Sequence, residues 1–195
     1  MILHDVVAFD LDGTLVDSAS LWCEATAGAM TEVFARNGIR APVPDEKTFR
    51  RVIGTPAPDS LFALLPADLH SLVPEITQGV RSRGSAAMRA GPPPLYRGVL
   101  EALGGLKRSG CAVAIATNAG RRYLDACLDS LGLRPHVDLA YCLDSPGVSD
   151  KSDMVAGILR EAGTRRGVMV GDRSHDLEAA HRNGIPFVAF EPGYG

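Results

Sequence analysis

The sequence predicts an α/β fold in which a doubly wound parallel sheet is interrupted by an all-helical insertion. Two observations lead to this prediction. Short apolar runs alternate with helical patterns in the second half of the 195-residue chain, and continuous apolar strands of this kind are typical of a parallel sheet covered on both faces. Between Asp17 and Pro92, by contrast, no stretch has the pattern of a strand. The insertion is therefore expected directly after the first strand.

The first strand is predicted over 6–9, where an apolar run meets the string DLDGT at 10–14. Asp10 and Asp12 stand two residues apart, so they point the same way where the strand ends. Two neighbouring carboxylates repel one another unless a cation or a shared proton offsets their charge. A helix cap or a turn would explain either acid alone, but it explains the pair much less well.

The insertion has the pattern of a series of helices. The first is predicted from a cap at Ser18 to about Arg36, with an apolar stripe at helical spacing and Gly38 as its stop. Further helices are predicted from Asp45, around 61–65 and over 67–89. The three prolines at 92–94 form a stiff linker that ends the insertion.

Beyond the linker, the pattern alternates between helix and strand. Helices are predicted over 99–110, 121–131, 152–162 and 175–183, and strands over 111–116, 137–143, 167–172 and 186–190. Ligands of such folds bind beyond the carboxyl ends of the strands. Polar residues follow the strands at these ends: Asp10, Asp12, Thr117, Asn118 and Asp172.

Composition and charge narrow the range of partners. The formal net charge of -3 argues against nucleic acid as a bulk electrostatic partner. No apolar run approaches the roughly 18 residues of a membrane span, and the early first strand leaves no room for a signal peptide. The four cysteines are scattered without metal-ligand spacing, so we expect small buried residues in a cytoplasmic protein. The oligomeric state stays open.

The polar residues form a set with a definite chemistry. The set contains the acids Asp10, Asp12, Asp172 and Asp176, and three carboxylates near one strand edge suit a hard cation such as Mg²⁺. The backbone N–H groups of 13–14, a hydroxyl and Lys151 suit a phosphate dianion. Together they predict phosphoryl transfer, in which positioning and charge neutralisation supply most of the catalysis.

Each member of this set also has an ordinary alternative. Thr117-Asn118 fits a plain turn, Lys151 a solvated side chain and Asp176 an acid favoured by a helix dipole. Trp22, early in the first helix of the insertion, either lines a pocket or packs between helices, and packing is the expectation. The functional interpretation of the set depends on its members occurring together at successive strand ends.

Four motifs in this order resemble the haloacid dehalogenase (HAD) superfamily of phosphohydrolases, in its phosphoglycolate-phosphatase-like branch. They are DLDGT at 10–14, Thr117-Asn118, Lys151 and GDRSHD at 171–176. The resemblance covers essentially the whole chain. It implies a Rossmann-like catalytic core at 1–16 and 95–195, with 17–94 as a helical cap domain. It also implies a Mg²⁺-dependent phosphatase that hydrolyses a small-molecule phosphoester (phosphoglycolate-like, nucleotide or sugar phosphate) through an aspartyl-phosphate.

The resemblance assigns a role to each matching residue. Asp10 would be the nucleophile and a metal ligand, and Asp12 the general acid and base whose backbone carbonyl also binds the metal. Lys151 would neutralise the nucleophile and the phosphate. Asp172 would be a metal ligand, and Asp176 a ligand directly or through water. The phosphate-binding residues would be Gly13, Thr14, Thr117, Asn118 and Lys151.

Two other functions remain open at this stage. A phosphosugar mutase of the same branch, similar to β-phosphoglucomutase, would share every core residue. A non-enzymatic phospho-acceptor, similar to a receiver domain, would carry its phosphorylated Asp on a later strand and would lack the helical insertion. An acid at Asp12 favours phosphoester chemistry over dehalogenation, because a leaving alkoxide needs a proton.

Overall fold

Among residues 4–195, which the computed structural model describes, five strands form one parallel sheet. The strands are β1 (Val6–Phe9), β2 (Ala112–Thr117), β3 (Leu139–Cys142), β4 (Gly167–Gly171) and β5 (Phe187–Ala189). Their order across the sheet is β3-β2-β1-β4-β5, so the first strand is central. The predicted doubly wound sheet is confirmed, and its topological switch point lies beside β1, where such folds bind ligands.

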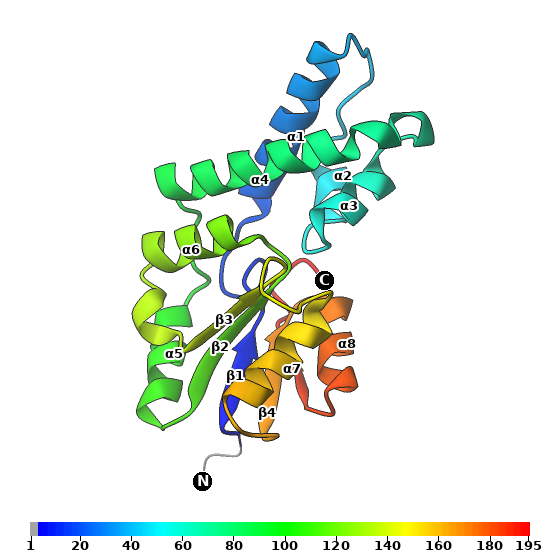
Figure 1. Ribbon diagram of the computed structural model, residues 1–195. Helices are drawn as coiled ribbons and strands as arrows, with labels where there is room; N and C mark the ends of the chain where they lie inside the picture. The colour runs from blue at the N-terminus through cyan, green and yellow to red at the C-terminus, as the bar shows by residue number, and fades with distance from the viewer. Residues whose placement is uncertain (1–3) are drawn as a thin grey trace.

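Helices cover both faces of the sheet, on its left and right in Figure 1. They are α5 (Val99–Arg108), α6 (Arg121–Ser130), α7 (Lys151–Glu161) and α8 (Ser174–Arg182), with a 3₁₀ turn η2 (Arg134–His136) after α6. Alternate residues of β1 point to opposite faces. Val7 and Phe9 are buried with α5 and α6, whereas Val6 and Ala8 are buried with α7 and α8. A strand buried on both faces needs a continuous apolar run, as the sequence has.

The helical insertion follows β1 and lies above the sheet in Figure 1. It contains α1 (Ala19–Arg36), α2 (Glu46–Arg50), α3 (Ala57–Leu64), a 3₁₀ segment η1 (Ala67–Leu72) and α4 (Val73–Ala90). The long helices α1 and α4 pack against one another around their own apolar cluster, which includes Met30, Phe34 and Ile76. All of 17–92 is described, and none of it lies in a strand of the sheet. We call the segment α1–α4 the cap.

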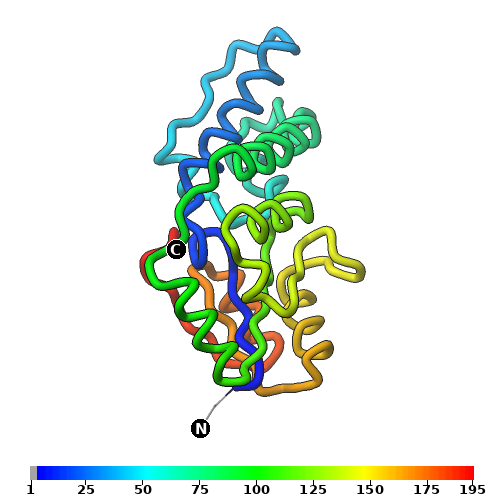
Figure 2. Tube along the Cα trace, turned by 90° about the vertical axis from the view of Figure 1, so that its left-hand side faces the viewer, coloured from blue at the N-terminus to red at the C-terminus, as the bar shows by residue number. Residues whose placement is uncertain are grey.

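The chain crosses between the sheet and the cap at two adjacent points. Val16 and Leu95 form an isolated antiparallel bridge there, and Asp17 N donates to the Pro94 carbonyl at 3.0 Å. Figure 2 shows the crossings at the junction of the two parts, with the C-terminal end of the chain beside them. The predicted domain boundaries after residues 16 and 94 fall near this bridge and stay a prediction.

Three local predictions changed in the structure. The stretch predicted as one helix over 67–89 divides into η1 and α4, and Pro74 lies in the first turn of α4, where its missing N–H costs no hydrogen bond. The helix predicted at 61–65 begins earlier, at Ala57. Ser18 precedes α1 but its side chain caps nothing: its backbone (φ -98°, ψ 7°) is not in the extended conformation that aims a capping hydroxyl at the helix, and its Oγ donates elsewhere.

No helix within the described part of the chain combines the length and the apolarity that a membrane crossing requires.

Candidate active site

The carboxyl ends of β1, β2 and β4 meet at one edge of the sheet, on the side that faces the cap. Phe9 pairs with Ile115 of β2 and with Val170 of β4, so the residues that follow these strands are neighbours. Asp10 and Thr117 are both buried at this edge. The parallel register therefore brings together groups that lie more than a hundred residues apart in the sequence.

Lys151 is the buried cation of the site. It is the first residue of α7, which Asp150 caps by accepting from Asp153 N, and its Nζ donates to Asp10 Oδ1 at 2.8 Å and to Asp176 Oδ1 at 2.7 Å. Burial raises the pKa of Asp10 to about 8, although Lys151 opposes this rise. Burial alone would lower the pKa of Lys151, but the two carboxylates outweigh it and raise that pKa.

Three carboxylates converge where a cation would lie. One oxygen each from Asp10, Asp172 and Asp176 lies within 4.8 Å of the others. Other bonds orient two of these acids: Asp172 accepts from the Thr14 hydroxyl at 3.2 Å and from Tyr194 N at 2.7 Å, and Asp176 Oδ2 accepts from a backbone N–H at 2.9 Å. Lys151 and Arg173, whose Nε lies 3.7 Å from Asp172 Oδ2, offset part of this negative charge, and an all-oxygen donor set fits a hard divalent cation.

Glycine is required beside two of these acids. A Cβ on Gly171 would lie 2.3 Å from the carboxyl carbon of Asp176. Gly13 has φ +87°, and a Cβ there would lie 2.8 Å from Asp172 Oδ2. The glycines of the DLDGT and GDRSHD motifs thus make room for the carboxylates.

Asp12 is held by three neutral donors that converge on one oxygen. Ser18 Oγ at 2.5 Å, Trp22 Nε1 at 3.0 Å and Tyr123 OH at 2.7 Å all donate to Oδ1. Ser18 and Trp22 come from the start of the cap, and Tyr123 comes from α6 of the core. Burial raises the pKa of Asp12, and the three hydrogen bonds oppose that rise.

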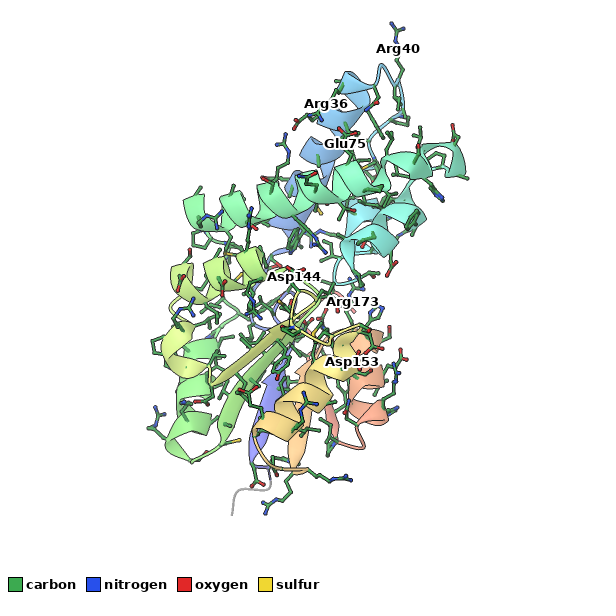
Figure 3. The ribbon with its side chains drawn as sticks, viewed as in Figure 1. Arg36, Arg40, Glu75, Asp144, Asp153 and Arg173 are labelled. Atoms are coloured by element: carbon green, nitrogen blue, oxygen red, sulfur yellow. The ribbon has the colours of Figure 1, made fainter. Side chains whose placement is uncertain are left out.

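Two loops of the core contact the cap at 50–54, the end of α2 and the loop that follows it. The Asn118 side chain donates to the Gly54 carbonyl at 3.0 Å, and Arg173 Nη2 donates to the Arg50 carbonyl at 3.2 Å. Figure 3 shows Arg173 and Asp144 at the end of the core that faces the cap. Hydrogen bonds therefore join this part of the cap to the edge of the sheet that carries the acids.

A model of one protein family, described as haloacid dehalogenase-like hydrolase, matches residues 7–190. The chain belongs to this family. A phosphoglycolate phosphatase from Caulobacter vibrioides is 30% identical over 98% of this chain and 83% of its own length. Tyrosine-protein kinase PtkA from Mycobacterium tuberculosis is 32% identical over 97% of this chain, which spans 63% of that longer protein. The crystal structure of a haloacid dehalogenase-like hydrolase, SP0104 from Streptococcus pneumoniae, superposes with a TM-score of 0.81 and 27% identity, over all of this chain and 88% of the other.

These findings confirm the resemblance that the motifs predicted. Phosphoglycolate phosphatases are among the relatives of this HAD-family chain, and the cap lies where the family carries its helical insertion. Its relatives named phosphoglycolate phosphatase act, by that name, on a phosphorylated small molecule.

The structure brings the acids and the lysine among the predicted site residues of this HAD-family chain together at one edge of the sheet. The N–H groups predicted to bind phosphate at Gly13 and Thr14 are already used in a tight turn, where they donate to the carbonyls of Val16 and Leu11 at 2.9 and 3.4 Å. The Thr14 hydroxyl donates to Asp172. Both residues therefore lie beside Asp172 in a loop that folds back on itself.

Several residues at the site were not predicted. Trp22 was expected to pack between cap helices. It does pack against the cap cluster, but it also lines the cavity, lies against Tyr123 of the core with ring centroids 4.6 Å apart, and donates to Asp12. Ser18 and Tyr194 were not predicted to reach the acids either. None belongs to a motif, and only their position in the folded chain brings them to the carboxylates.

Proposed function

We propose that this protein is a phosphatase that hydrolyses a small-molecule phosphate monoester through an aspartyl-phosphate on Asp10, with Mg²⁺ as its cofactor. The observation that supports this most is that two carboxylates with different kinds of hydrogen-bond partner line the same cavity. Asp10 is bonded to a buried lysine, whereas Asp12 is bonded only to neutral donors. Lys151 favours the ionised form of Asp10 against the burial that raises its pKa, whereas the burial of Asp12 raises its pKa with no cation bonded to it and favours a proton retained for transfer.

Asp10, Asp172 and Asp176 would hold the cation, together with the backbone carbonyl of Asp12. When bound, Mg²⁺ supplies positive charge that offsets the phosphoryl oxygens and lowers the pKa of Asp10 from its raised value of about 8. Because both oxygens of Asp176 already accept hydrogen bonds, this residue is better placed to act through water.

In the first step the Asp10 oxygen that Lys151 does not hold attacks phosphorus. The bond between phosphorus and the ester oxygen breaks, and Asp12 gives its proton to the departing alcohol. Thr117 and the backbone N–H of Asn118 would bind the transferring group. Three bonds fix Oδ1 of Asp12, so Oδ2 is the oxygen free to exchange the proton.

In the second step a water molecule attacks phosphorus and gives a proton to Asp12. The bond between phosphorus and Asp10 breaks, inorganic phosphate leaves, and both acids return to their starting states. The raised pKa of Asp12 suits this cycle, because a group that both donates and accepts a proton works best near the ambient pH.

A mutase would use the same residues but return the phosphoryl group to a sugar. The cap side of the cavity offers few polar side chains for sugar hydroxyls, and this favours the hydrolase. We also infer a cytoplasmic location, which the four buried, unpaired cysteines support.

Asp10→Asn tests the proposal. Hydrolysis of p-nitrophenyl phosphate should fall by at least about 10⁴-fold, because an amide is no nucleophile. Asp129→Asn, which changes an exposed carboxylate paired with Arg134, should leave the rate unchanged. EDTA should abolish turnover and added Mg²⁺ restore it. Full activity in Asp10→Asn would contradict the proposal, as would conversion of a hexose 1-phosphate to its isomer without release of phosphate.

A further inference from the structure

The cavity between the sheet edge and the cap has two unlike ends. It is partly open to solvent, and its floor carries Asp10, Asp12 and the β2 loop at 117–120. The opposite wall belongs to the cap and is mainly apolar, with side chains from Trp22, Phe49, Val52, Ile53, Leu64 and Val80. A ligand with its phosphate on the floor would therefore place the rest of its structure against hydrocarbon.

The wall also carries four polar side chains, Thr26, Thr55, Ser60 and Arg81, of which Ser60 and Arg81 already have partners. The Ser60 hydroxyl lies within 3.1 to 3.3 Å of three backbone carbonyls of its own turn, those of Val52, Thr55 and Pro56. The Asn118 side chain at the rim is bonded to the Gly54 carbonyl. These groups are not available to a ligand without loss of an existing hydrogen bond.

The wall also has little positive charge to offer. Within the described residues, Arg81 is the one cationic side chain of the cap that lines this cavity. Its side chain is 45% exposed, and its Nη1 lies 3.6 Å from Asp144 Oδ1. A second anionic group on the ligand would have to share this arginine with Asp144.

We propose that the substrate is the phosphate monoester of an apolar alcohol, with an alkyl or aryl group that lies against the cap wall; this rests on the phosphatase function proposed above. Removal of apolar surface from water would supply the binding. A small carboxylated ester or a sugar phosphate would lose hydrogen bonds to water that the few polar side chains of this wall, Thr26, Thr55 and Arg81 among them, replace only in part. In the transfer step the departing alkoxide takes its proton from Asp12, as described above.

A series of n-alkyl phosphates tests the proposal with Mg²⁺ present. Ethyl, butyl and hexyl alcohols have similar acidities, so differences in kcat/KM report contacts with the hydrocarbon. We expect kcat/KM to rise about fourfold for each added methylene until the wall is covered. Phosphoglycolate should be hydrolysed at least tenfold less efficiently than butyl phosphate. A flat or falling series, or preference for phosphoglycolate, would overturn the proposal.

A pair of matched variants locates the effect on the wall. Val52→Thr places a hydroxyl on the cavity with little change of shape, whereas Val43→Thr makes the same change at a half-buried site that packs against the cap's hydrophobic cluster and does not line the cavity. The rise along the alkyl series should flatten in Val52→Thr and persist in Val43→Thr. Equal slopes in both variants would place the apolar contact elsewhere and overturn the assignment to this wall.

Binding of the matching n-alkylphosphonates, measured by calorimetry, separates this inference from the proposed function. These compounds keep the phosphoryl group and the chain but cannot be hydrolysed. Affinity that rises with chain length, without turnover of any ester, would contradict the phosphatase function and keep the ligand class. Flat affinity with turnover that depends on Asp10 would contradict the ligand class and keep the function.

Discussion

The core and the cap contribute opposite chemistry to one cavity. The core places acids, one lysine and a hydroxyl at the sheet edge, and these groups are bonded to one another before any substrate is present. The cap places mainly apolar side chains opposite them, several of which also belong to the cap's own hydrophobic cluster. Side chains that face the site in each part therefore also contribute to the packing or bonding that stabilises that part.

On the proposed function, the core therefore supplies the catalytic chemistry, and the cap supplies the selection of the substrate. Groups that neutralise charge must be held in position in advance, because reorganisation at the moment of reaction would cost rate. An apolar wall selects by shape and area, so its side chains can change without disturbance of the acids below. The exception is Asp12, whose partners Ser18 and Trp22 lie at the start of the cap. Changes at the sheet edge should therefore have larger effects than changes at the junction.

The largest effect is expected for Lys151→Met. This change removes the cation between two buried carboxylates, and uncompensated charge of this kind costs about 3–5 kcal/mol. The comparison is Lys107→Met, which breaks a half-exposed pair with Asp138 and should cost less than about 1 kcal/mol. Urea denaturation in EDTA measures both. Equal losses would show that the pair at the sheet edge is no more important to stability than one at the surface.

Asp12→Asn should come next. The amide keeps the shape and can still accept hydrogen bonds at one atom, but it cannot transfer a proton, so hydrolysis of an alkyl phosphate should fall by about a hundredfold or more. Formation of the aspartyl-phosphate from p-nitrophenyl phosphate should fall much less, because nitrophenolate leaves without a proton. Burst kinetics separate the two steps. An equal loss of the first step with both esters would exclude the general-acid role.

The smallest effect is expected for Tyr123→Phe. The phenol donates to Asp12 and so lowers the pKa of that acid; without it the pKa rises. Because the acid must be protonated to act, the alkaline limb of the profile of kcat/KM against pH should move to higher pH, with a change in rate of about tenfold or less. Tyr141→Phe, which loses a bond to Glu161 away from the site, should leave the profile in place. If the pH profile of Tyr123→Phe does not move, the phenol does not tune the pKa of Asp12 and contributes only packing.

Much of the core could be predicted, because it follows from local pattern and one geometric rule. Continuous apolar runs specify buried parallel strands, and parallel strands present their carboxyl ends at one edge. Asp10, Lys151 and Asp176 could thus be placed together although their positions in the chain are far apart. The glycines beside the acids belong to the same motifs.

The partners of the acids could not be predicted in this way. Tyr123 lies 111 residues from Asp12 and belongs to no motif, and Ser18 had the pattern of a helix cap. Gly13 and Thr14 were assigned to phosphate from their place in a motif, but a tight turn uses their N–H groups. A hydrogen bond depends on tenths of an ångström, and such distances are set by the packing of the whole molecule.

The sequence by itself determined the sheet, the helical insertion and the acids and lysine of the catalytic edge, because periodicity and strand direction are local and regular. Only the tertiary structure decided which donors hold Asp12, which bonds orient Asp172 and what kind of surface faces them. These features arise at the contact between two separately packed parts, and no periodic pattern in the sequence specifies that contact.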